Sequence, residues 1–369
     1  MNTTPFIYKN IFLHASLQFC GNIEEYFSLY TEKLVVFIVM PRIDNKCNLI
    51  RLYKKGRLIY EEKFACSNNL ILYYCLWYFH YIKALLRYFS PKEKVYIITF
   101  HPLSFFGRKI IKFLRDVEFV YWIGDYFPPT NLLLVSFEKL KKYYHDSCKY
   151  SCYLSDKINE KFNGRILNNK AHKTVMWGVN PKNIKRSNPK DNFTILFVGL
   201  VKESQGLNLV FNFLKDHRDY KLKIIGICEK KLYKKYQRML VENNLLKRVY
   251  FPNKFASDDE LVEQSKDCHV GIALYDINPN NATNFADPGK IKAYAEMQLP
   301  VIMSNISDIA NFVKRYKSGE VIEHIDDLLG ALKTIRKDYI YYQEGLRNFN
   351  NYFYFKDYYR KAFTFMEHL

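Results

Sequence analysis

The sequence predicts an α/β protein made of two doubly wound domains, in which mostly parallel sheets are covered by helices. Short apolar runs, several of which end in glycine, alternate with longer stretches of helical character along most of the 369 residues. Alternation of this kind is typical of parallel sheets. The length suits two domains of about 180 residues each, and each is long enough to bury a core. Residues 181–191 are basic, rich in Asn and contain proline, as expected of a linker.

The first half of the chain divides into alternating elements. Strands are expected at 10–14, 34–40, 95–100, 117–123 and 151–155, a hairpin at 47–64, and helices at 23–33, 69–89, 104–115 and 132–145. The stretch 69–89 allows two interpretations: a buried helix of the domain, which we favour because its polar face is thin, or a helix lying on a membrane surface. The stretch 132–145 carries Lys139, Lys141 and Lys142, which suit either acidic lipid headgroups or solvent.

The second half shows the same alternation more regularly. Strands are expected at 193–199, 222–226, 248–251, 270–274 and 299–302, and helices at 207–215, 230–243, 258–265, after 289, at 325–336 and at 352–365. Sheets of this type bind their ligands at the carboxyl ends of the strands. Gly199, Gly226 and Lys290 all fall at such ends.

The turn Asp287-Pro288-Gly289-Lys290 is the most informative stretch of the chain. Proline and glycine indicate a turn, and Asp287 is suited to cap the helix that follows. A helix N-terminus offers free N–H groups and the positive end of the helix dipole, and Lys290 adds a full charge. The turn therefore predicts a phosphate site, although an ordinary loop with a surface lysine would have the same residues.

An ordered set of motifs resembles the nucleotide-sugar-binding domain of GT-B glycosyltransferases, particularly retaining family 4. The residues that carry the resemblance are Phe197-Val198-Gly199 with Gly206-Leu207, Ile224-Ile225-Gly226, residues 267–272, and Pro288-Gly289-Lys290 with Leu299-Pro300-Val301-Ile302. The resemblance covers roughly 192–322. It implies the GT-B fold: two Rossmann-like domains facing a cleft, an acceptor-binding domain at 1–183, a nucleotide-sugar-binding domain at 192–345, and a C-terminal helix at 346–369 that crosses back to the first domain.

The resemblance assigns donor-binding roles to positions in the second domain, with some departures. The family usually has Arg after the first glycine and Lys before the second, where this chain has Leu200 and Gln205. Lys202 in the same loop is expected to substitute for these cations. The family glutamate that binds ribose is replaced by Ala293, and Glu296 lies one turn later on the same helix face. The full set expected to bind the donor is Gly199, Gln205, Gly226, Asn253, Lys254, Gly289, Lys290 and Glu296, with Asn253 and Lys254 at the nucleobase.

In the first domain, the resemblance places Gly21, Asn22 and His101 in loops that face the cleft. Asp125 follows a strand where the family often carries a His-Asp or similar pair, and here Gly124 replaces the histidine. The resemblance implies a retaining transfer in which the leaving diphosphate helps to deprotonate the acceptor and the protein supplies alignment and charge. Asp125 and Lys202 are the expected catalytic residues; Asp125 equally suits a simple turn cap. No metal and no cofactor are expected, and the nucleotide-diphosphate sugar is the substrate.

The chain is strongly basic, with a formal net charge of +19, and residues 1–190 carry 30 Lys and Arg against 14 Asp and Glu. Such a surplus suits a polyanionic partner such as an anionic membrane, although an A+T-rich coding sequence would also raise the lysine content. The eight cysteines form no metal-type pairs, which indicates free thiols. Signal-peptide and membrane-spanning patterns are missing, so we expect a cytoplasmic protein at the inner face of the membrane.

These observations together predict a glycosyltransferase, of hexosyltransferase type, that acts on a glycan or lipid-linked acceptor in surface polysaccharide or glycoconjugate synthesis. Two alternatives stay open: a catalytically silent GT-B partner, indicated by Leu200, Gln205 and Ala293, and a nucleotide-sugar epimerase of the same fold. Nucleic-acid binding is not expected, because no helix-turn-helix, zinc module or stacking-strand motif accompanies the charge.

Overall fold

The structure is a computed structural model that describes residues 6–15, 21–39, 48–64, 67, 69–164, 171–184, 186, 193–254, 256–278 and 281–367. The chain forms two compact units. The first comprises Met1–Gly178 together with Phe355–Leu369, and the second comprises Val179–Tyr354. Most of the expected linker, residues 185 and 187–191, lies outside the described residues.

The first unit is built on an eight-stranded sheet with the order β4-β3-β2-β1-β5-β6-β7-β8. Its strands are β1 (Tyr8–Ala15), β2 (Thr31–Ile38), β3 (Asn48–Lys54), β4 (Arg57–Phe64), β5 (Val95–Thr99), β6 (Val117–Ile123), β7 (Tyr150–Tyr153) and β8 (His172–Thr174). The neighbouring strands β2, β1, β5, β6, β7 and β8 pair in parallel. Strand β3 pairs antiparallel with β2, and β4 pairs antiparallel with β3. Chain order reverses between β1 and β5, so the carboxyl ends of these strands mark the usual ligand position.

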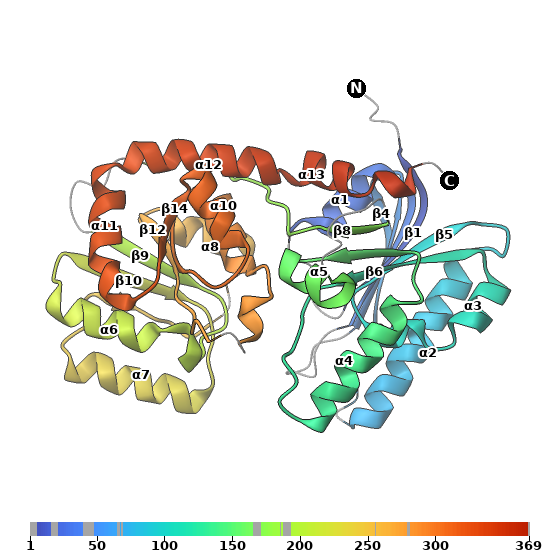
Figure 1. Cartoon of the computed structure of the whole chain (residues 1–369), viewed down its shortest axis with the longest axis horizontal. Coiled ribbons are helices and arrows are strands. Elements are labelled where there is room, and N and C mark those ends of the chain that lie inside the picture. The colour runs from blue at the N-terminus through green and yellow to red at the C-terminus, as the bar shows by residue number, and fades with distance from the viewer. Residues whose placement is uncertain are drawn as a thin grey trace. The chain divides into compact units, whose positions relative to one another are not determined.

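Helices cover both faces of this sheet. They are α1 (Ile23–Tyr30), α2 (Leu70–Tyr88), α3 (Arg108–Leu114), α4 (Leu132–His145), α5 (Asp156–Asn163) and α13 (Phe355–Ala362), with short 3-10 turns at Pro102–Phe105 and Thr364–Met366. Figure 1 shows α1 and α13 above the sheet and α2, α3 and α4 below it. Among the described residues, none of the helices combines the length and apolarity needed to cross a membrane.

The second unit contains a six-stranded parallel sheet with the order β11-β10-β9-β12-β13-β14. Its strands are β9 (Phe193–Val198), β10 (Tyr220–Ile225), β11 (Val249–Tyr250), β12 (Val270–Ala273), β13 (Val301–Ser304) and β14 (Gly319–Ile322). In chain order this is the arrangement 3-2-1-4-5-6 of dinucleotide-binding sheets, with the reversal between β9 and β12. The loops after these two strands are therefore the expected place for a ligand.

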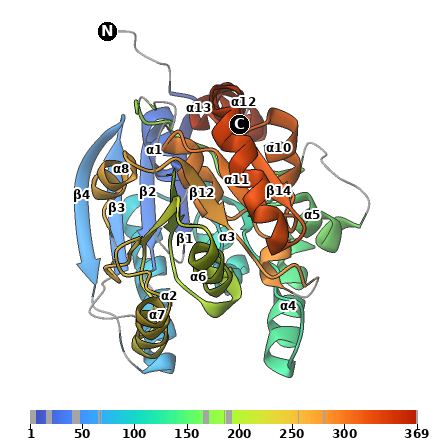
Figure 2. The same cartoon turned by 90° about the vertical axis from the view of Figure 1, so that its left-hand side faces the viewer.

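The helices of the second unit pack on both faces of its sheet (Figure 2). They are α6 (Leu207–Asp216), α7 (Lys230–Glu242), α8 (Asp258–Ser265), α9 (Gly289–Glu296), α10 (Ile309–Tyr316), α11 (Leu328–Lys337) and α12 (Tyr339–Phe353), with 3-10 turns at Glu203–Gln205, Ala282–Asn284 and Ile325–Asp327. Apolar side chains of α6, α7 and α11 form one core with β9, β10 and β12. The α/β class of both units, with mostly parallel sheets, confirms the predicted fold.

The C-terminal segment returns to the first unit, as the resemblance implied. Phe355, Tyr359 and Phe363 of this segment are fully buried. The Tyr359 hydroxyl donates to the Gly21 carbonyl at 2.7 Å and accepts from the Gly178 N–H at 2.7 Å. The resemblance places the start of this segment at 346. In the structure it starts at Phe355, because α12 belongs to the second unit.

Some expected elements differ from the observed ones. The helix expected at 23–33 ends at Tyr30, because Thr31 already pairs with Tyr8 and begins β2. The helix expected at 352–365 is divided between α12 and α13, which meet at Tyr354. The expectation of a solvent or headgroup contact for Lys141 is wrong, because this lysine is buried and its ammonium group forms an ion pair with Glu138 at 2.8 Å.

Candidate functional site

Helix α9 begins with the phosphate-type turn and is held tightly on the sheet. The Tyr294 hydroxyl donates to the Ile272 carbonyl at 2.8 Å and accepts from the Val198 N–H at 3.1 Å. The ring lies directly against the glycine backbone of β12, since a Cβ built on Gly271 would lie 2.3 Å from a Tyr294 ring carbon. The side chain thus links β9, β12 and α9, and it fixes the position of the turn at 287–290.

Asp287 does not cap α9, contrary to the expectation from its position. The N-cap residue is Pro288, with no side-chain hydrogen bond to the helix. The Asp287 carboxylate lies 3.6 Å from the Lys292 ammonium group, and both side chains are buried. The Lys292 nitrogen also lies 3.2 Å from the ring centroid of Phe353. Burial lowers the pKa of Lys292 to about 8, against the opposing effect of Asp287. This buried pair joins the turn to the second turn of α9.

Lys290, by contrast, has no carboxylate partner among the described residues. Its ammonium group donates to the Gln205 side-chain oxygen at 3.0 Å and lies 3.9 Å from the ring centroid of Phe197 and 5.3 Å from that of Tyr275. Burial lowers the pKa of Lys290 to about 7. A desolvated cation held only by an amide oxygen and aromatic rings is a favourable partner for an anion. The sequence predicted Lys290 and Gln205 but not the two aromatic residues.

Glycines shape the loops after β9 and β10. Gly199 has φ 107°, a conformation that side chains rarely adopt, and its carbonyl would lie 1.9 Å from a Cβ built on Gly226. The two loops can approach this closely because Gly226 carries no side chain, whereas Gly199 is required by its positive φ. Gly206 ends the loop after β9 with φ 69°. Lys202 is exposed in that loop, directly before the Glu203–Gln205 turn.

Asn253 and Glu296 have structural partners within the second unit. Asn253 has φ 52°, and its side-chain oxygen accepts from the Cys228 N–H at 2.8 Å, so it ties the loop after β11 to the loop after β10. The Glu296 carboxylate accepts from the Asn180 N–H at 2.7 Å. Glu296 therefore holds the start of the second unit against the end of α9. Lys254 is exposed beside Asn253.

A pocket of about 430 Å³ lies beside Gly206 at the carboxyl ends of β12, β13 and β14. Its polar lining includes Ser204, Asp276, Ser304, Glu323 and His324. Hydroxyl, carboxylate and imidazole groups of this kind can hydrogen-bond a neutral polyol. The sequence reasoning missed this lining because it did not predict β14, whose end supplies two of these residues.

The candidate residues of the first unit lie at the carboxyl ends of β1, β5 and β6. Gly21 and Asn22, both with positive φ, follow β1 and directly precede α1, with Asn22 as its N-cap residue. The His101 Nδ1 accepts from the Leu103 N–H at 3.2 Å, and burial together with Lys141 lowers the pKa of this histidine to about 4. The Asp125 side chain is exposed, and its carbonyl accepts from the Lys141 ammonium group at 2.5 Å. The buried pair of Lys141 and Glu138 thus supports the loop that carries Asp125.

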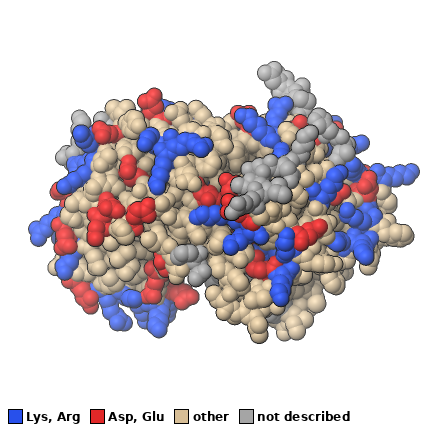
Figure 3. All heavy atoms as spheres, in the orientation of Figure 1, with Lys and Arg blue, Asp and Glu red and all other residues tan. Residues whose placement is uncertain are grey.

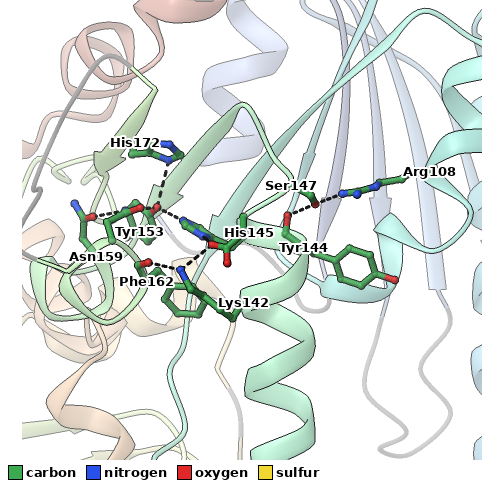
Figure 4. A network of polar contacts seen from close by, with 11 residues as sticks. Arg108, Lys142, Tyr144, His145, Ser147, Tyr153, Asn159, Phe162 and His172 are labelled. Atoms are coloured by element: carbon green, nitrogen blue, oxygen red, sulfur yellow. Dashed lines mark hydrogen bonds and ion pairs between the residues drawn. The ribbon is translucent and has the colours of Figure 1, made fainter.

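A second polar network of the first unit joins α4, β7, α5 and β8 (Figure 4). The His145 ring contacts the Asp146 carboxylate at 2.8 Å and the Tyr153 hydroxyl at 2.6 Å. Burial lowers the pKa of His145, so a neutral ring that donates to Asp146 and accepts from Tyr153 satisfies both contacts. Asn163 also donates to Tyr153, and Lys142 donates to the Phe162 carbonyl at 2.6 Å. Because its members bind one another, we interpret this network as structural.

Comparison with known proteins confirms the resemblance to GT-B glycosyltransferases. Residues 211–365 match the family described as glucosyltransferase 3-like, C-terminal domain. Sucrose-phosphate synthase from Thermosynechococcus elongatus is 13% identical, with a TM-score of 0.66 over 96% of this chain and 99% of that chain. HepE of Anabaena in complex with UDP is 12% identical, with a TM-score of 0.67 over 98% and 100% of the two chains. The lipopolysaccharide outer core galactosyltransferase WaaB is 17% identical, with a TM-score of 0.62 over 97% and 99%. No curated protein sequence matches.

The chain therefore has the GT-B fold, and the comparisons support the glycosyltransferase class. Within that class, the family match is to glucosyltransferase 3-like domains, and it includes the 287–290 turn and all of α9. This match starts inside α6 and leaves out the loop of Gly199, Lys202 and Gln205. In that loop the chain lacks the two cations that are usual in retaining family 4.

Proposed function

We propose that this protein transfers a hexose, with retention of configuration, from a nucleoside-diphosphate sugar to a hydroxyl of a glycan or lipid-linked acceptor. Such a reaction belongs to the synthesis of surface polysaccharides or glycoconjugates. Support comes from the glucosyltransferase 3-like match and from similar structures that contain UDP. Retention is supported by analogy with trehalose-6-phosphate synthase, another structure of the same fold, which transfers its glycosyl group with retention.

One observation carries this proposal: the desolvated ammonium group of Lys290 at the start of α9, which has no carboxylate partner among the described residues. The α9 N-terminus and Lys290 together offer N–H donors, a helix dipole and a full charge to a single anion. The ligand expected there is the donor diphosphate, which offers the cation a negatively charged partner. Gln205, which now accepts from Lys290, would be displaced or would share the ammonium group.

In the proposed reaction the protein acts mainly by charge and alignment. Lys290 and the α9 N–H groups stabilise the negative charge that grows on the leaving diphosphate as the glycosidic bond breaks. Lys202, exposed in the loop after β9, adds a second positive charge, and Asp125 orients a hydroxyl of the sugar or acceptor. The diphosphate oxygen takes the acceptor proton. The pocket of Ser304 and Glu323 supplies hydrogen-bonding groups for the neutral sugar.

We further propose that the first unit contacts an anionic membrane, where a lipid-linked acceptor would lie. Large apolar side chains project from α3 and from the start of α4: Phe113 is 89% exposed, Ile110 66% and Leu132 84%. Arg108, Lys109 and Lys112 are interspersed with those of α3. Apolar and basic side chains mixed on one surface favour adsorption to acidic lipids.

The proposed donor site is tested by titrating the protein with UDP-glucose and other sugar nucleotides. Lys290→Ala should weaken binding about 10- to 100-fold, because a hydrogen bond to a charged group contributes about 1.5–3 kcal/mol. Isothermal titration calorimetry measures this directly. Lys290→Met keeps the aliphatic stem and excludes loss of packing as the cause.

Lys215→Ala serves as the matched control, because Lys215 is an exposed lysine in the last turn of α6. Its affinity should equal that of the wild type. If Lys290→Ala also binds sugar nucleotides with wild-type affinity, the proposed donor site is wrong.

A catalytically silent partner is the second candidate, favoured by the contact in which Gln205 occupies the Lys290 ammonium group. A silent protein would bind sugar nucleotides without hydrolysing or transferring the sugar. Release of nucleoside diphosphate in the presence of acceptor extracts would exclude this candidate.

A further inference from the structure

A row of basic residues crosses the first sheet at the end opposite to its candidate site residues. Asn10 of β1 pairs with Lys33 of β2, Lys33 pairs with Lys54 of β3, and Lys54 pairs with Arg57 of β4. Directly paired residues point to the same face of a sheet, and neighbouring strands lie about 4.8 Å apart. Three cations therefore follow one another within about 10 Å across β2, β3 and β4.

This arrangement is unfavourable for the sheet itself. Like charges directly opposite each other on neighbouring strands are destabilising. The same hairpin avoids this cost elsewhere: Arg51 of β3 faces Glu61 of β4, and the two form an ion pair at 2.7 Å. The cationic row is thus a local exception within this hairpin.

The row borders a pocket of about 580 Å³ in which cations outnumber carboxylates. Its lining comprises Lys9, Asn10, Glu32, Lys33, Lys54, Lys55, Arg57 and Glu93. Of the five cations, Lys33 forms an ion pair with Glu93 at 2.7 Å. The side chains of Lys9, Lys54, Lys55 and Arg57 have no hydrogen bond or ion pair with any residue that the structure describes. Several unpaired cations therefore face one hollow.

The turn of the hairpin presents these charges. Lys55 and Gly56 have φ values of 47° and 78°, and this two-residue turn brings Lys54 and Arg57 face to face. The Lys55 N–H donates to the Glu32 carbonyl at 2.9 Å, which fixes the turn against β2. The cations are thus held on a defined backbone and lie in the space that an anion would enter.

We propose that this pocket binds a phosphate-bearing anion of about the size of a diphosphate, separately from the donor site of the second unit. Lys54 and Arg57 bind its oxygens, and the fork of Arg57 suits two of them at once. The anion lowers the repulsion between the paired cations, so ligand binding stabilises the hairpin. Both a soluble phosphate compound and a lipid headgroup offer this chemistry.

The test uses Lys54→Glu, which separates binding from folding. This change alternates the charges along the row, so we expect it to keep or raise the melting temperature while it repels the anion. Lys63→Glu in the same hairpin is the matched control, because Lys63 is exposed and faces Leu49 rather than a cation. Both variants are made in full-length protein that carries Lys290→Met, so that the donor site does not contribute.

Isothermal titration calorimetry with inorganic pyrophosphate should show binding to the Lys290→Met protein, a loss of at least tenfold in Lys54→Glu, and an unchanged affinity in Lys63→Glu. Equal affinities in the two hairpin variants, or no pyrophosphate binding at all, would overturn the proposal. Sedimentation with phosphatidylglycerol vesicles then distinguishes a lipid headgroup from a soluble phosphate compound as the ligand. Weaker sedimentation of Lys54→Glu supports a lipid headgroup, and unchanged sedimentation supports a soluble phosphate compound.

Discussion

At the scale of single residues, the two lysines of α9 show how burial decides function. Lys290 and Lys292 lie two residues apart, and burial lowers the pKa of both. Lys292 is paired with the buried Asp287, whereas Lys290 contacts a neutral amide oxygen and aromatic rings and no carboxylate within the described part of the chain. Lys292 therefore stabilises the turn, whereas the Lys290 ammonium group is available to an anionic ligand.

The pKa of Lys290 predicts how the affinity for the donor changes with pH. Because this pKa is about 7 in the free protein, the ammonium group is largely charged at pH 6 and largely neutral at pH 8.5. A diphosphate binds the charged form, so the affinity for UDP-glucose should fall at least tenfold between these pH values. The diphosphate of a sugar nucleotide has no terminal phosphate that titrates in this range, so the change reports the protein. Calorimetric titrations at several pH values measure it.

Lys290→Met is the control for this prediction, because it removes the titrating group and should flatten the pH profile. An affinity of the wild-type protein that stays constant from pH 6 to 8.5 would contradict the assignment of Lys290 to the diphosphate.

Residue types alone did not reveal which neighbours each site residue would have. The turn at Gly289 and Lys290 was predictable because proline followed by glycine indicates the start of a new element. The contact between Glu296 and the backbone of Asn180 was not predictable, because these residues are separated by more than a hundred positions in the chain. The contacts of Phe197 and Tyr275 with Lys290 were not predictable either, because they depend on which strands are neighbours in the sheet.

At the scale of elements, α9 depends on a close approach to β12. The Tyr294 ring occupies the space that a side chain on Gly271 would fill. Gly271→Ala should therefore lower the free energy of unfolding by about 2–3 kcal/mol, since overpacking of a core has costs of this size. It should also weaken sugar-nucleotide binding, because α9 carries the phosphate turn. Chemical denaturation and calorimetry measure the two effects.

Gly330→Ala is the matched control, since a Cβ at Gly330 in α11 meets no atom within 4 Å. This change should stabilise the protein by about 1 kcal/mol through helix propensity. A Gly271→Ala protein as stable as the wild type would show that α9 is not held as described.

Most elements were predictable because their apolar periodicity agrees with their final environment. The regular alternation after residue 193 places five strands of the second sheet correctly. The sixth, β14 (Gly319–Ile322), was missed because only two of its four residues are buried and it has little apolar pattern. The end of α1 was misplaced because the pairing of Thr31 with Tyr8 is a long-range contact that overrides local helix preference.

At the scale of the whole molecule, charged and apolar surface are distributed unevenly along the chain. Residues 1–190 contain 30 of the 56 Lys and Arg but only 14 of the 37 Asp and Glu. On the face shown in Figure 3, the lower end of the first unit, where α4 begins, carries few charged side chains. Leu132 and Leu133 at the start of α4 are 84% and 79% exposed. Coding bias explains a general surplus of lysine, but it does not explain exposed leucine and phenylalanine beside it.

This distribution predicts binding to anionic vesicles through α3. The protein should sediment with phosphatidylglycerol vesicles but not with phosphatidylcholine vesicles, and higher salt should weaken the binding because it screens the charges. Ile110→Ser with Phe113→Ser should weaken it at least tenfold, since both side chains lose apolar surface that enters the lipid. Val241→Ser with Leu246→Ser is the control, because these exposed apolar residues belong to the second unit. If both double variants bind alike, the membrane surface lies elsewhere; if neutral vesicles bind as well as anionic ones, the basic residues of α3 have no part in the contact.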